Sequence, residues 1–325
     1  DFDHQEIGLA ALEKTGTTLP DAVMEKARTA DGIILGPVSH LDYPDPKEGG
    51  INVSGFIRSN LDLYANIRPA RTRANLPSPT GKAMDLVIVR ENTEGFYADR
   101  SMYRGMGEMM PSPDMALAVR KITAQASLRI AEEAFKYAVG RRRKVTAVHK
   151  ANVLRVSDGL FLDQVRKVAA GHADIEYEEV LVDAMAAHLI RDPGRYDVIV
   201  TTNMYGDILS DEASELAGGL GLAGSLNAGD DHGVAQAQHG SAPDIAGKGI
   251  ANPTSLILSA AMLLNWLGQR HGDTALNQAA ALIDAAVDDC LDDPATRTTD
   301  LGGSLSTQDY ADAVAEGITV SSPAA

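Results

Sequence analysis

Two carboxylates, Asp207 and Asp211, stand four residues apart in the stretch NMYGDILSDEAS. The apolar run just before them, YDVIVTT at 196–202, predicts a buried strand, so both acids are expected near the start of a helix. At this spacing the two side chains share one helix face, where like charges repel. A solvated helix start accounts for Asp207, because the helix dipole favours acids there, but it accounts less well for Asp211.

A divalent cation is the alternative reason for placing two acids on one helix face. Mg²⁺ binds oxygen ligands and commonly takes one or two protein carboxylates, while water and substrate fill the other positions. A third acid, Asp183, follows another apolar run in VLVDAMAAH. The pattern alone leaves both the solvated helix start and the cation site open.

Three arginines could recognise a carboxylate, since a guanidinium group binds it in a bidentate manner. Arg58 and Arg68 lie in GFIRSNLDLYANIRPARTR, and Arg90 ends the apolar run LVIVR. A single arginine is usually a surface charge, an interpretation that fits Arg90 least. Tyr97 in ENTEGFY and Lys150 at the end of KVTAVHK are candidate proton carriers. A lysine at a strand end is usually solvated, but near a cation or arginines its pKa would fall and it could act as a base.

The elements that must position these side chains alternate between strands and helices. Apolar runs rich in β-branched residues predict strands at 31–36, 84–90, 144–150, 178–183 and 196–202. Helical periodicity predicts a helix over 115–139, a helix with Ser157 as its N-cap, and a mostly helical region after Pro253. This alternation is typical of an α/β fold. The segments 65–83 and 99–114 have no clear period and are expected to form a crossing connection and an excursion loop.

Two glycine-rich stretches raise the question of nucleotide binding. GLGLAG at 219–224 matches the G-x-G-x-x-G pattern, but that motif needs a strand before it and a helix after it. The preceding SDEASELAGG looks helical and the following SLNAGDDHG looks like a loop, so we reject the match. HGSAPDIAGKGIANPT at 239–254 is different, because a long loop rich in Gly and Pro can wrap a ligand with backbone groups.

Composition limits the partners and the compartment. The chain has 325 residues and a net charge of −16, which argues against nucleic acid or an anionic membrane as the main partner. Its single cysteine, Cys290, allows no intramolecular disulfide and fits a reducing compartment, so we expect a cytoplasmic protein. No apolar run is long enough to span a bilayer, and no signal peptide is visible.

Taken together, these stretches resemble the β-decarboxylating dehydrogenase family, which includes isocitrate, homoisocitrate, isopropylmalate and tartrate dehydrogenases. The resemblance runs from about residue 31 to 320 and rests on LDLYANIRP, VRENTEGFY, TAVHKANVLRVSDGLFL, VDAMAAHL, NMYGDILSD, HGSAPDIAGKGIANPT and DLGGS. It implies an α/β, two-domain isopropylmalate-dehydrogenase-like fold with a shared mixed sheet, not a standard Rossmann domain. Residues 1–64 plus 218–325 would form the nucleotide-binding large domain, without the family's N-terminal strand and GDGIGPE-like loop. Residues 65–217 would form the dimerisation and metal/substrate domain.

The resemblance also implies a metal centre that two subunits share. Asp207 and Asp211 would bind Mg²⁺ or Mn²⁺ together with Asp183 from the neighbouring subunit. The cation would chelate the substrate's α-hydroxyl and the adjacent carboxylate. Lys150, also from the neighbour, would take the hydroxyl proton while hydride passes to the nicotinamide. A shared site implies an obligate homodimer or a higher even oligomer.

Substrate recognition would depend on the arginines and on the residues before the first of them. Arg58, Arg68 and Arg90 would hold the carboxylate that leaves as CO₂, and Tyr97 would then protonate the enolate. In the stretch GGINVSGFIR, Asn52, Ser54 and Gly55 leave a small site that can be polar, which favours isocitrate or homoisocitrate. 3-Isopropylmalate and tartrate stay open as substrates. A non-catalytic regulatory subunit is the competing class, and the presence of all the catalytic residue types argues for an enzyme.

The family's nucleotide loop would be HGSAPDIAGKG in this chain. Here the family's usual FEPVHG is AQAQHG, so that Gln236 replaces an acid. The residues expected to contact the cofactor are His239, Gly240, Ser241, Ala242, Asp244, Ile245 and Asn252, with Asn152 near the nicotinamide side.

NAD rather than NADP is the expected cofactor. Asp244 would face the adenosine ribose, where a carboxylate accepts hydrogen bonds from free hydroxyls and repels a 2′-phosphate. NADP-dependent relatives tend to have a Lys-Tyr pair where this chain has Asp244 and Ile245. Initial-rate assays are therefore expected to give a KM for NAD well below the KM for NADP. Comparable KM values for the two cofactors would refute the assignment.

Overall fold

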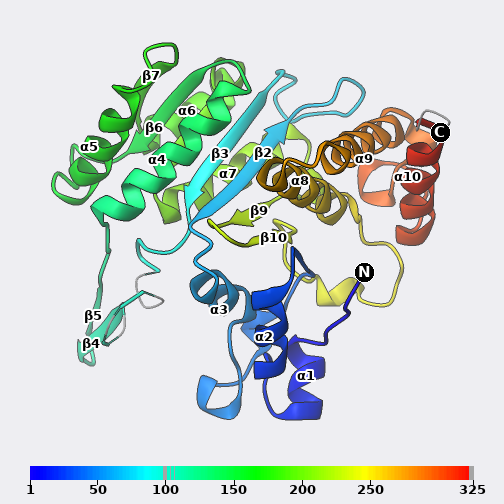
Figure 1. The fold of residues 1–325 in the computed structure, drawn as a ribbon, viewed down its shortest axis with the longest axis horizontal. Coiled ribbons are helices and arrows are strands. Elements are labelled where there is room, and N and C mark those ends of the chain that lie inside the picture. The colour runs from blue at the N-terminus through cyan, green and yellow to red at the C-terminus, as the bar shows by residue number, and fades with distance from the viewer. Residues whose placement is uncertain (98–100, 103, 106, 322–325) are drawn as a thin grey trace. The chain divides into compact units, whose positions relative to one another are not determined.

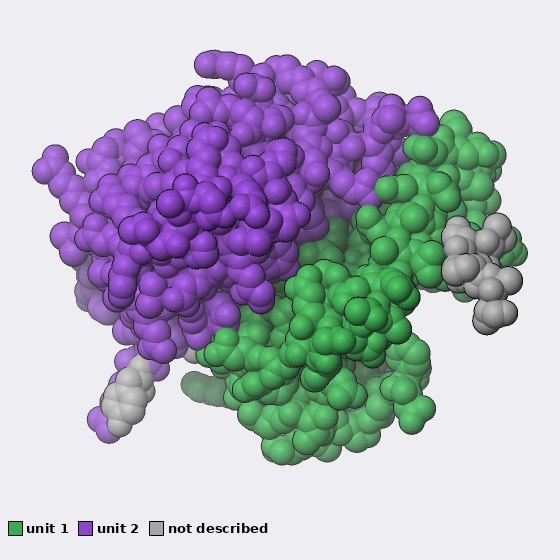
Figure 2. Space-filling model, turned by 45° about the horizontal axis from the view of Figure 1, so that its top comes forward, with its two compact units in different colours: residues 1–62, 224–325 green, residues 63–223 purple. Residues whose placement is uncertain are grey.

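A computed structural model describes residues 1–97, 101–102, 104–105 and 107–321, and the chain divides into two compact units (Figure 2). The first unit comprises residues 1–62 and 224–325, and the second comprises residues 63–223. The assignment of nucleotide binding to one part of the chain and of metal binding to the other stays a prediction. No helix in the described part of the chain is both long and apolar enough to cross a membrane.

The main sheet of the second unit has the strand order β2-β3-β8-β6-β7 (Figure 1). β2 is antiparallel to β3, whereas β3, β8, β6 and β7 run parallel to one another. The inner strands are continuous apolar runs because both faces of a parallel sheet are covered. The strands span Ala65–Arg71 (β2), Asp85–Glu91 (β3), Lys144–His149 (β6), Glu176–Leu181 (β7) and Val198–Thr201 (β8).

Four helices cover these strands. α4 contacts β3, β6 and β8, and α5 packs on α4 and β6. α7 contacts β2, β3 and β8, and α6 packs on α7 and β7. Figure 1 shows α4 in front of the strands and α7 behind them. The helices span Ala124–Val139 (α4), Ser157–Ala169 (α5), Val182–Arg191 (α6) and Asn203–Ala217 (α7).

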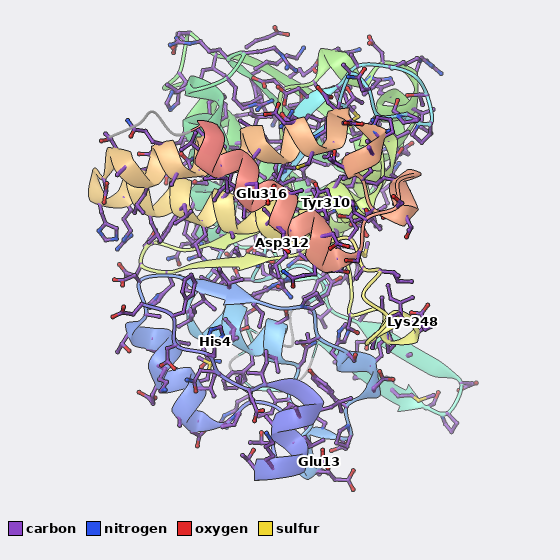
Figure 3. All side chains as sticks on the ribbon, turned by 90° about the vertical axis from the view of Figure 1, so that its right-hand side faces the viewer. His4, Glu13, Lys248, Tyr310, Asp312 and Glu316 are labelled. Carbon is purple, nitrogen blue, oxygen red and sulfur yellow. The ribbon has the colours of Figure 1, made fainter. Side chains whose placement is uncertain are left out.

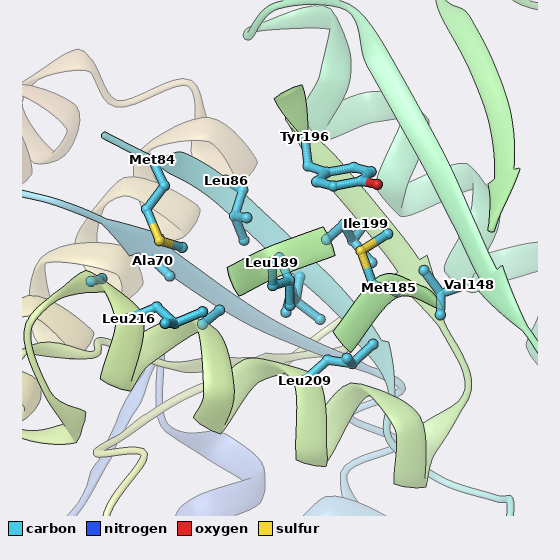
Figure 4. Close-up of a cluster of buried hydrophobic side chains, with 13 residues drawn as sticks. Ala70, Met84, Leu86, Val148, Met185, Leu189, Tyr196, Ile199, Leu209 and Leu216 are labelled. Carbon is cyan, nitrogen blue, oxygen red and sulfur yellow. The ribbon is translucent and has the colours of Figure 1, made fainter. Parts of the chain in front are cut away.

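A cluster of buried apolar side chains joins the sheet of the second unit to helices α6 and α7 (Figure 4). Ile88 of β3 and Ile199 of β8 belong to the same cluster as Leu189 of α6 and Leu209 of α7. Apolar burial of this kind is the main stabilising term for such a layer. The cluster therefore fixes α7, the helix that carries the two acids, against the strands.

The parallel pairing brings several predicted site residues to one edge of the sheet. Arg90 of β3 lies opposite Thr201 of β8, and Val148 of β6 lies opposite Thr201 from the other side. The carboxyl ends of parallel strands meet at the same edge. Lys150 follows β6, and helix α7 follows β8. Both therefore lie at the edge of the sheet where β3 carries Arg90.

The first unit combines helices with three short strands in the order β1-β10-β9. β1 is parallel to β10, and β10 is antiparallel to β9. α9 packs between α8 and α10, contacting both. Within α10, Tyr310 is buried whereas Asp312 and Glu316 are exposed (Figure 3). The elements span Gly8–Thr15 (α1), Asp21–Thr29 (α2), Ile33–Leu35 (β1), Val53–Asn60 (α3), Leu226–Ala228 (β9), Gly233–Gln236 (β10), Thr254–His271 (α8), Thr274–Asp292 (α9) and Thr307–Ser321 (α10).

The prediction that 65–83 is only a connection is wrong, because Ala65–Arg71 forms β2. Asn66 and Arg68 are buried along with the apolar residues beside them. The sequence does alternate between apolar Ala65, Ile67 and Pro69 and polar Asn66 and Arg68, but the proline weakens the strand signal and the polar side chains are not on an exposed face.

The predicted helix over 115–139 begins only at Ala124, where Thr123 accepts a hydrogen bond from the Ala126 N–H at 3.2 Å and caps it. Met115–Ala118 (β5) instead pairs with Glu108–Ser112 (β4) in an exposed hairpin. Part of the expected excursion loop is therefore strand. Residues 99, 100, 103 and 106 of that loop lie outside the described residues.

Two smaller expectations also need correction. Ser157 is the first residue of α5, and the N-cap is Val156. The rejection of GLGLAG is confirmed on its N-terminal side, because helix α7 precedes it. On its C-terminal side the expected loop contains a strand, β9.

Leu189→Ala is expected to lower the free energy of unfolding by about 2–5 kcal/mol, because the substitution leaves a cavity in the core of the second unit. Val139→Ala is the matched control, since Val139 is half exposed at the end of α4 and its truncation should change stability by no more than about 0.5 kcal/mol. Urea unfolding followed by circular dichroism measures both. Equal losses in the two variants would contradict the placement of Leu189 in the core.

Candidate active site

Arg68 of β2 lies between the two acids of α7. Its Nη1 atom is 3.3 Å from Oδ1 of Asp207 and 3.3 Å from Oδ1 of Asp211. The same nitrogen donates a hydrogen bond to the Ser210 hydroxyl at 2.7 Å. The two acids share one helix face as the spacing predicts, and a single guanidinium group offsets their mutual repulsion.

Arg90 of β3 approaches Asp207 from the sheet. Its Nη1 atom is paired with Oδ1 of Asp207, and its Nε donates to the backbone oxygen of Asn203 at 2.9 Å. Its Nη2 also donates to the Asn203 side-chain oxygen at 2.6 Å. Asn203 is the first residue of α7, so these contacts fix the start of the helix to the end of β3.

The charged groups of this cluster differ in their exposure. The side chains of Arg68 and Arg90 are 7% and 2% exposed, whereas those of Asp207 and Asp211 are 38% and 52% exposed. Burial lowers the pKa of Arg68 to about 10, with a further lowering from the Arg90 charge and an opposing effect of the two acids. Arg68 is therefore cationic at neutral pH, and the carboxylates are the groups that a ligand can reach.

Tyr97 joins the cluster from the loop that follows β3. Its hydroxyl donates a hydrogen bond to Oδ2 of Asp207 at 3.3 Å, and the Arg90 guanidinium lies 5.8 Å from the centre of its ring. The loop is held because Gly95 and Lys121 exchange two backbone hydrogen bonds of 2.8 and 2.9 Å. The structure thus brings together five of the predicted site residues: the two arginines, Tyr97 and the two acids.

Lys150 and Asp183 form a separate pair. The ammonium group donates to Oδ1 of Asp183, and this hydrogen bond lowers the pKa of the Asp183 carboxyl. Asp183 is the second residue of α6, not the end of a strand. In the described part of the chain, no group of three or more His, Cys, Asp or Glu side chains is placed to hold a metal ion. Asp183 therefore does not complete such a group with Asp207 and Asp211 within one chain.

Arg58 and Ser54 lie on α3 in the first unit, beside Gln236 at the end of β10. Nη2 of Arg58 donates to the Gln236 side-chain oxygen at 3.3 Å, and the Gln236 amide nitrogen donates to the Ser54 hydroxyl. An amide can accept from the arginine and donate to the serine at once, which an ionised glutamate cannot do. The substitution at Gln236 thus links the two predicted substrate-binding residues.

The predicted nucleotide loop makes contacts within itself and also contacts Ser39, which is far from it in the sequence. Nδ1 of His239 is 2.9 Å from the backbone oxygen of Gly240, and the Ser241 hydroxyl bonds to that of Ser39. Ala242 has a φ of +44°, which turns the chain into a short helix at Pro243–Ile245. That helix carries Asp244, which is exposed, and Ile245, which is partly buried.

Asn252 and Asn152 have different surroundings. Nδ2 of Asn252 donates to Oδ2 of Asp300 in DLGGS at 3.0 Å, and its side-chain oxygen accepts from the Thr254 N–H at 3.0 Å. The orientation of its amide is therefore set by the protein. Asn152 is exposed in the turn that follows β6.

The donor groups fit the ligands that the resemblance implies. Asp207 and Asp211 present carboxylate oxygens on one exposed face, the donor type that Mg²⁺ and Mn²⁺ prefer. Two protein carboxylates are a normal complement for Mg²⁺. The exposed loop around Asp244 offers backbone groups and one carboxylate, which suits a nucleotide with free ribose hydroxyls.

Three further residues of the cluster were not singled out from the sequence: Asn203, Ser210 and Gly206. A Cβ atom added at Gly206 would lie 2.6 Å from Cγ and 2.7 Å from Cβ of Arg90. Only glycine lets α7 approach the arginine this closely. A glycine inside a helix weakens it by about 1 kcal/mol, so its presence in NMYGDILSD is a signal that could have indicated a packing role.

Gly206→Ala is expected to displace Arg90 from Asp207 and Asn203, and to destabilise the protein by about 1–3 kcal/mol through overcrowding. Gly159→Ala in α5 is the control, because an added Cβ at Gly159 meets nothing within 4 Å. That change should be neutral or stabilising by up to about 1 kcal/mol. Thermal unfolding of both variants measures the difference, and a neutral Gly206→Ala would contradict the close approach of α7 to Arg90.

Comparison with known proteins supplies an independent line of support. Residues 1–314 match the family model described as isocitrate/isopropylmalate dehydrogenase. The chain is 45% identical to a homoisocitrate dehydrogenase of Methanocaldococcus jannaschii, over 95% of this chain and 87% of that one. It is 43% identical to a 3-isopropylmalate dehydrogenase of Saccharolobus solfataricus, over 97% and 88% of the two chains. The crystal structure of isocitrate dehydrogenase from Methylococcus capsulatus superposes with a TM-score of 0.84 at 40% identity, covering 97% of this chain and 89% of that one. The chain therefore belongs to the isocitrate/isopropylmalate dehydrogenase family, and the dehydrogenase class expected from its sequence is confirmed.

Proposed function

We propose that the chain catalyses the oxidative decarboxylation of a 3-substituted malate, with NAD as hydride acceptor and Mg²⁺ or Mn²⁺ as a bound cation. The observation that carries this proposal is the convergence of two buried arginines and the Tyr97 hydroxyl on Asp207. A site that combines guanidinium groups with reachable carboxylates can bind an anion and a cation side by side.

The arginines would bind a carboxylate of the substrate. The guanidinium groups of Arg68 and Arg90 are buried, so each needs an anionic partner, and Asp207 supplies it in this structure. A substrate carboxylate could take over part of that pairing, which would leave the Asp207 oxygens to a cation. Arg58 would contribute a third guanidinium group to the same carboxylate.

Asp207 and Asp211 would hold the divalent cation, and Asp183 would add a third carboxylate. When bound, the cation would polarise the hydroxyl oxygen and NAD would accept the hydride from the hydroxyl-bearing carbon. Lys150 would take the hydroxyl proton as the hydride leaves. Loss of CO₂ from the resulting 2-oxo acid leaves an enolate, and Tyr97 would donate its phenolic proton to the enolate carbon.

We propose further that two subunits share each site. Lys150 and Asp183 are paired with one another, so one subunit would contribute both residues to the site of its neighbour. The lack of a three-acid group within the described residues of one chain supports this arrangement. A homodimer is the smallest assembly that would complete two such sites.

Isocitrate or homoisocitrate is the proposed substrate. Ser54 and Gln236 place a hydroxyl and an amide beside Arg58, a polar surface suited to a substituent that ends in a carboxylate. An isopropyl group can neither donate nor accept a hydrogen bond, so it gains nothing from these polar groups, which disfavours it. Relatives named for homoisocitrate and for 3-isopropylmalate are about equally similar to this chain. The choice of substrate therefore rests on the polar residues beside Arg58.

A substrate panel tests the proposal. Purified protein with Mg²⁺ or Mn²⁺ and NAD is mixed in turn with isocitrate, homoisocitrate, 3-isopropylmalate and tartrate, and NADH is followed by its absorbance. The highest kcat/KM is expected for isocitrate or homoisocitrate. Ser54→Leu should shift the preference towards 3-isopropylmalate, because it replaces the hydroxyl by apolar surface. Turnover of none of the four hydroxy acids would overturn the proposed function.

A further inference from the structure

A buried ion pair, Arg120–Asp158, lies in the second unit outside the cluster around Asp207. Nη1 of Arg120 is paired with Oδ1 of Asp158, and the two side chains are 8% and 0% exposed. Removing two charges from water costs several kcal/mol for each ion unless further hydrogen bonds compensate. The other contacts of the pair therefore show what it holds in place.

The Arg120 side chain joins two segments that follow neighbouring parallel strands. Its Nη1 donates to the Ser157 hydroxyl at the start of α5 at 3.0 Å, and its Nη2 donates to the Thr202 hydroxyl at 2.9 Å. Thr202 is the N-cap position of α7, the helix of the paired acids. The guanidinium also lies 5.2 Å from the ring centre of Tyr205 in α7, and 6.0 Å from that of Phe96, the residue before Tyr97.

The second oxygen of the Asp158 carboxylate holds the backbone of the predicted catalytic lysine. Oδ2 of Asp158 accepts a hydrogen bond from the Lys150 N–H. The Lys150 carbonyl in turn accepts from the N–H groups of Val153 and Leu154, at 3.0 and 2.8 Å. The Leu154 carbonyl accepts from the Asp158 N–H at 3.0 Å, which closes the turn. The carboxylate thus fixes the point at which the lysine leaves β6.

We propose that Arg120 and Asp158 are positioning residues for the dehydrogenase reaction: through one buried ion pair they hold the main chain of Lys150 against the start of α7. This inference rests on the proposed function, because Arg120 and Asp158 have a positioning role only if Lys150 and Asp207 act as described. Within the described residues, neither side chain contacts a group that would bind substrate or cation, so the pair would act through the backbone. A misplacement of about 1 Å at a reacting group can lower the rate by about a hundredfold.

The same unit offers a matched pair, Arg141–Asp197, whose contacts among the described residues reach Asp85 at the start of β3 but neither Lys150 nor α7. Nε of Arg141 is 2.8 Å from Oδ1 of Asp197, which is 1% exposed and lies just before β8. Thr202 lies just after β8, so the two ion pairs hold opposite ends of one strand. A role confined to stability would make the two pairs equivalent in their effect on the rate.

The experiment compares conservative variants of both pairs under conditions in which wild type turns over its preferred hydroxy acid. Arg120→Lys and Asp158→Asn are expected to lower kcat at least about tenfold, with the KM values for hydroxy acid and NAD within about threefold of wild type, because positioning acts on the chemical step. Arg141→Lys and Asp197→Asn should lower the Tm but leave kcat within about twofold of wild type. Circular dichroism melting measures the Tm of all four variants.

Guanidinium rescue adds a readout that a structural role would not produce. In Arg120→Ala, millimolar guanidinium chloride should restore part of the lost kcat without raising the Tm, while Arg141→Ala shows no such gain. If Arg120→Ala does not fold, Arg120→Lys decides the question through its kcat. Equal kcat losses in the two pairs, or losses seen only in KM, would overturn the inference while leaving the proposed function intact. Wild type that turns over no hydroxy acid would overturn both.

Discussion

The arrangement of strands β2 and β3 and helix α7 in the second unit depends on the ion pairs of Asp207 with two buried guanidinium groups. A buried arginine without an anion is strongly unfavourable, so Arg68 and Arg90 require a carboxylate at the start of α7. That requirement fits the antiparallel pairing of β2 with β3, in which Arg90 lies opposite Asn66 and Arg68 opposite Ile88, so that the two arginines are diagonal neighbours on one face of the sheet. It also explains Gly206, since any larger residue would push the helix away from Arg90.

The same arrangement suits a site in which the arginines exchange Asp207 for a substrate carboxylate. The arginines are buried and fixed by Asn203 and Ser210, whereas the acids are partly exposed and carry oxygens that a ligand can reach. Groups that are held in place before the substrate arrives need no costly reorganisation during the reaction. The protein would supply fixed positive charge for a carboxylate, fixed negative charge for a cation, and a phenol in contact with Asp207. The proposed chemistry follows from this juxtaposition.

Much of this could be predicted from the sequence because the relevant signals are local. The apolar runs mark the inner strands, and the spacing of Asp207 and Asp211 correctly places them on one helix face. The features that the sequence did not predict depend on tertiary contacts. β2 was missed because Pro69 weakens the strand signal of Ala65–Arg71, and the partners that bury Asn66 and Arg68 are not visible in the local pattern. The pairing of Arg68 with both acids, and the role of Arg120 and Asp158, join residues far apart in the chain and cannot be deduced from spacing.

The most direct test of the central claim is the binding of Mn²⁺ to the acids of α7, followed by electron paramagnetic resonance of the free ion in the presence of homoisocitrate. Wild type is predicted to bind about one Mn²⁺ per chain. Asp207→Asn is predicted to bind it at least about tenfold more weakly, while Asp174→Asn, which changes an exposed acid paired with Arg143, binds it as wild type does. Unchanged Mn²⁺ affinity in a folded Asp207→Asn variant would contradict the claim that this helix face forms the cation site.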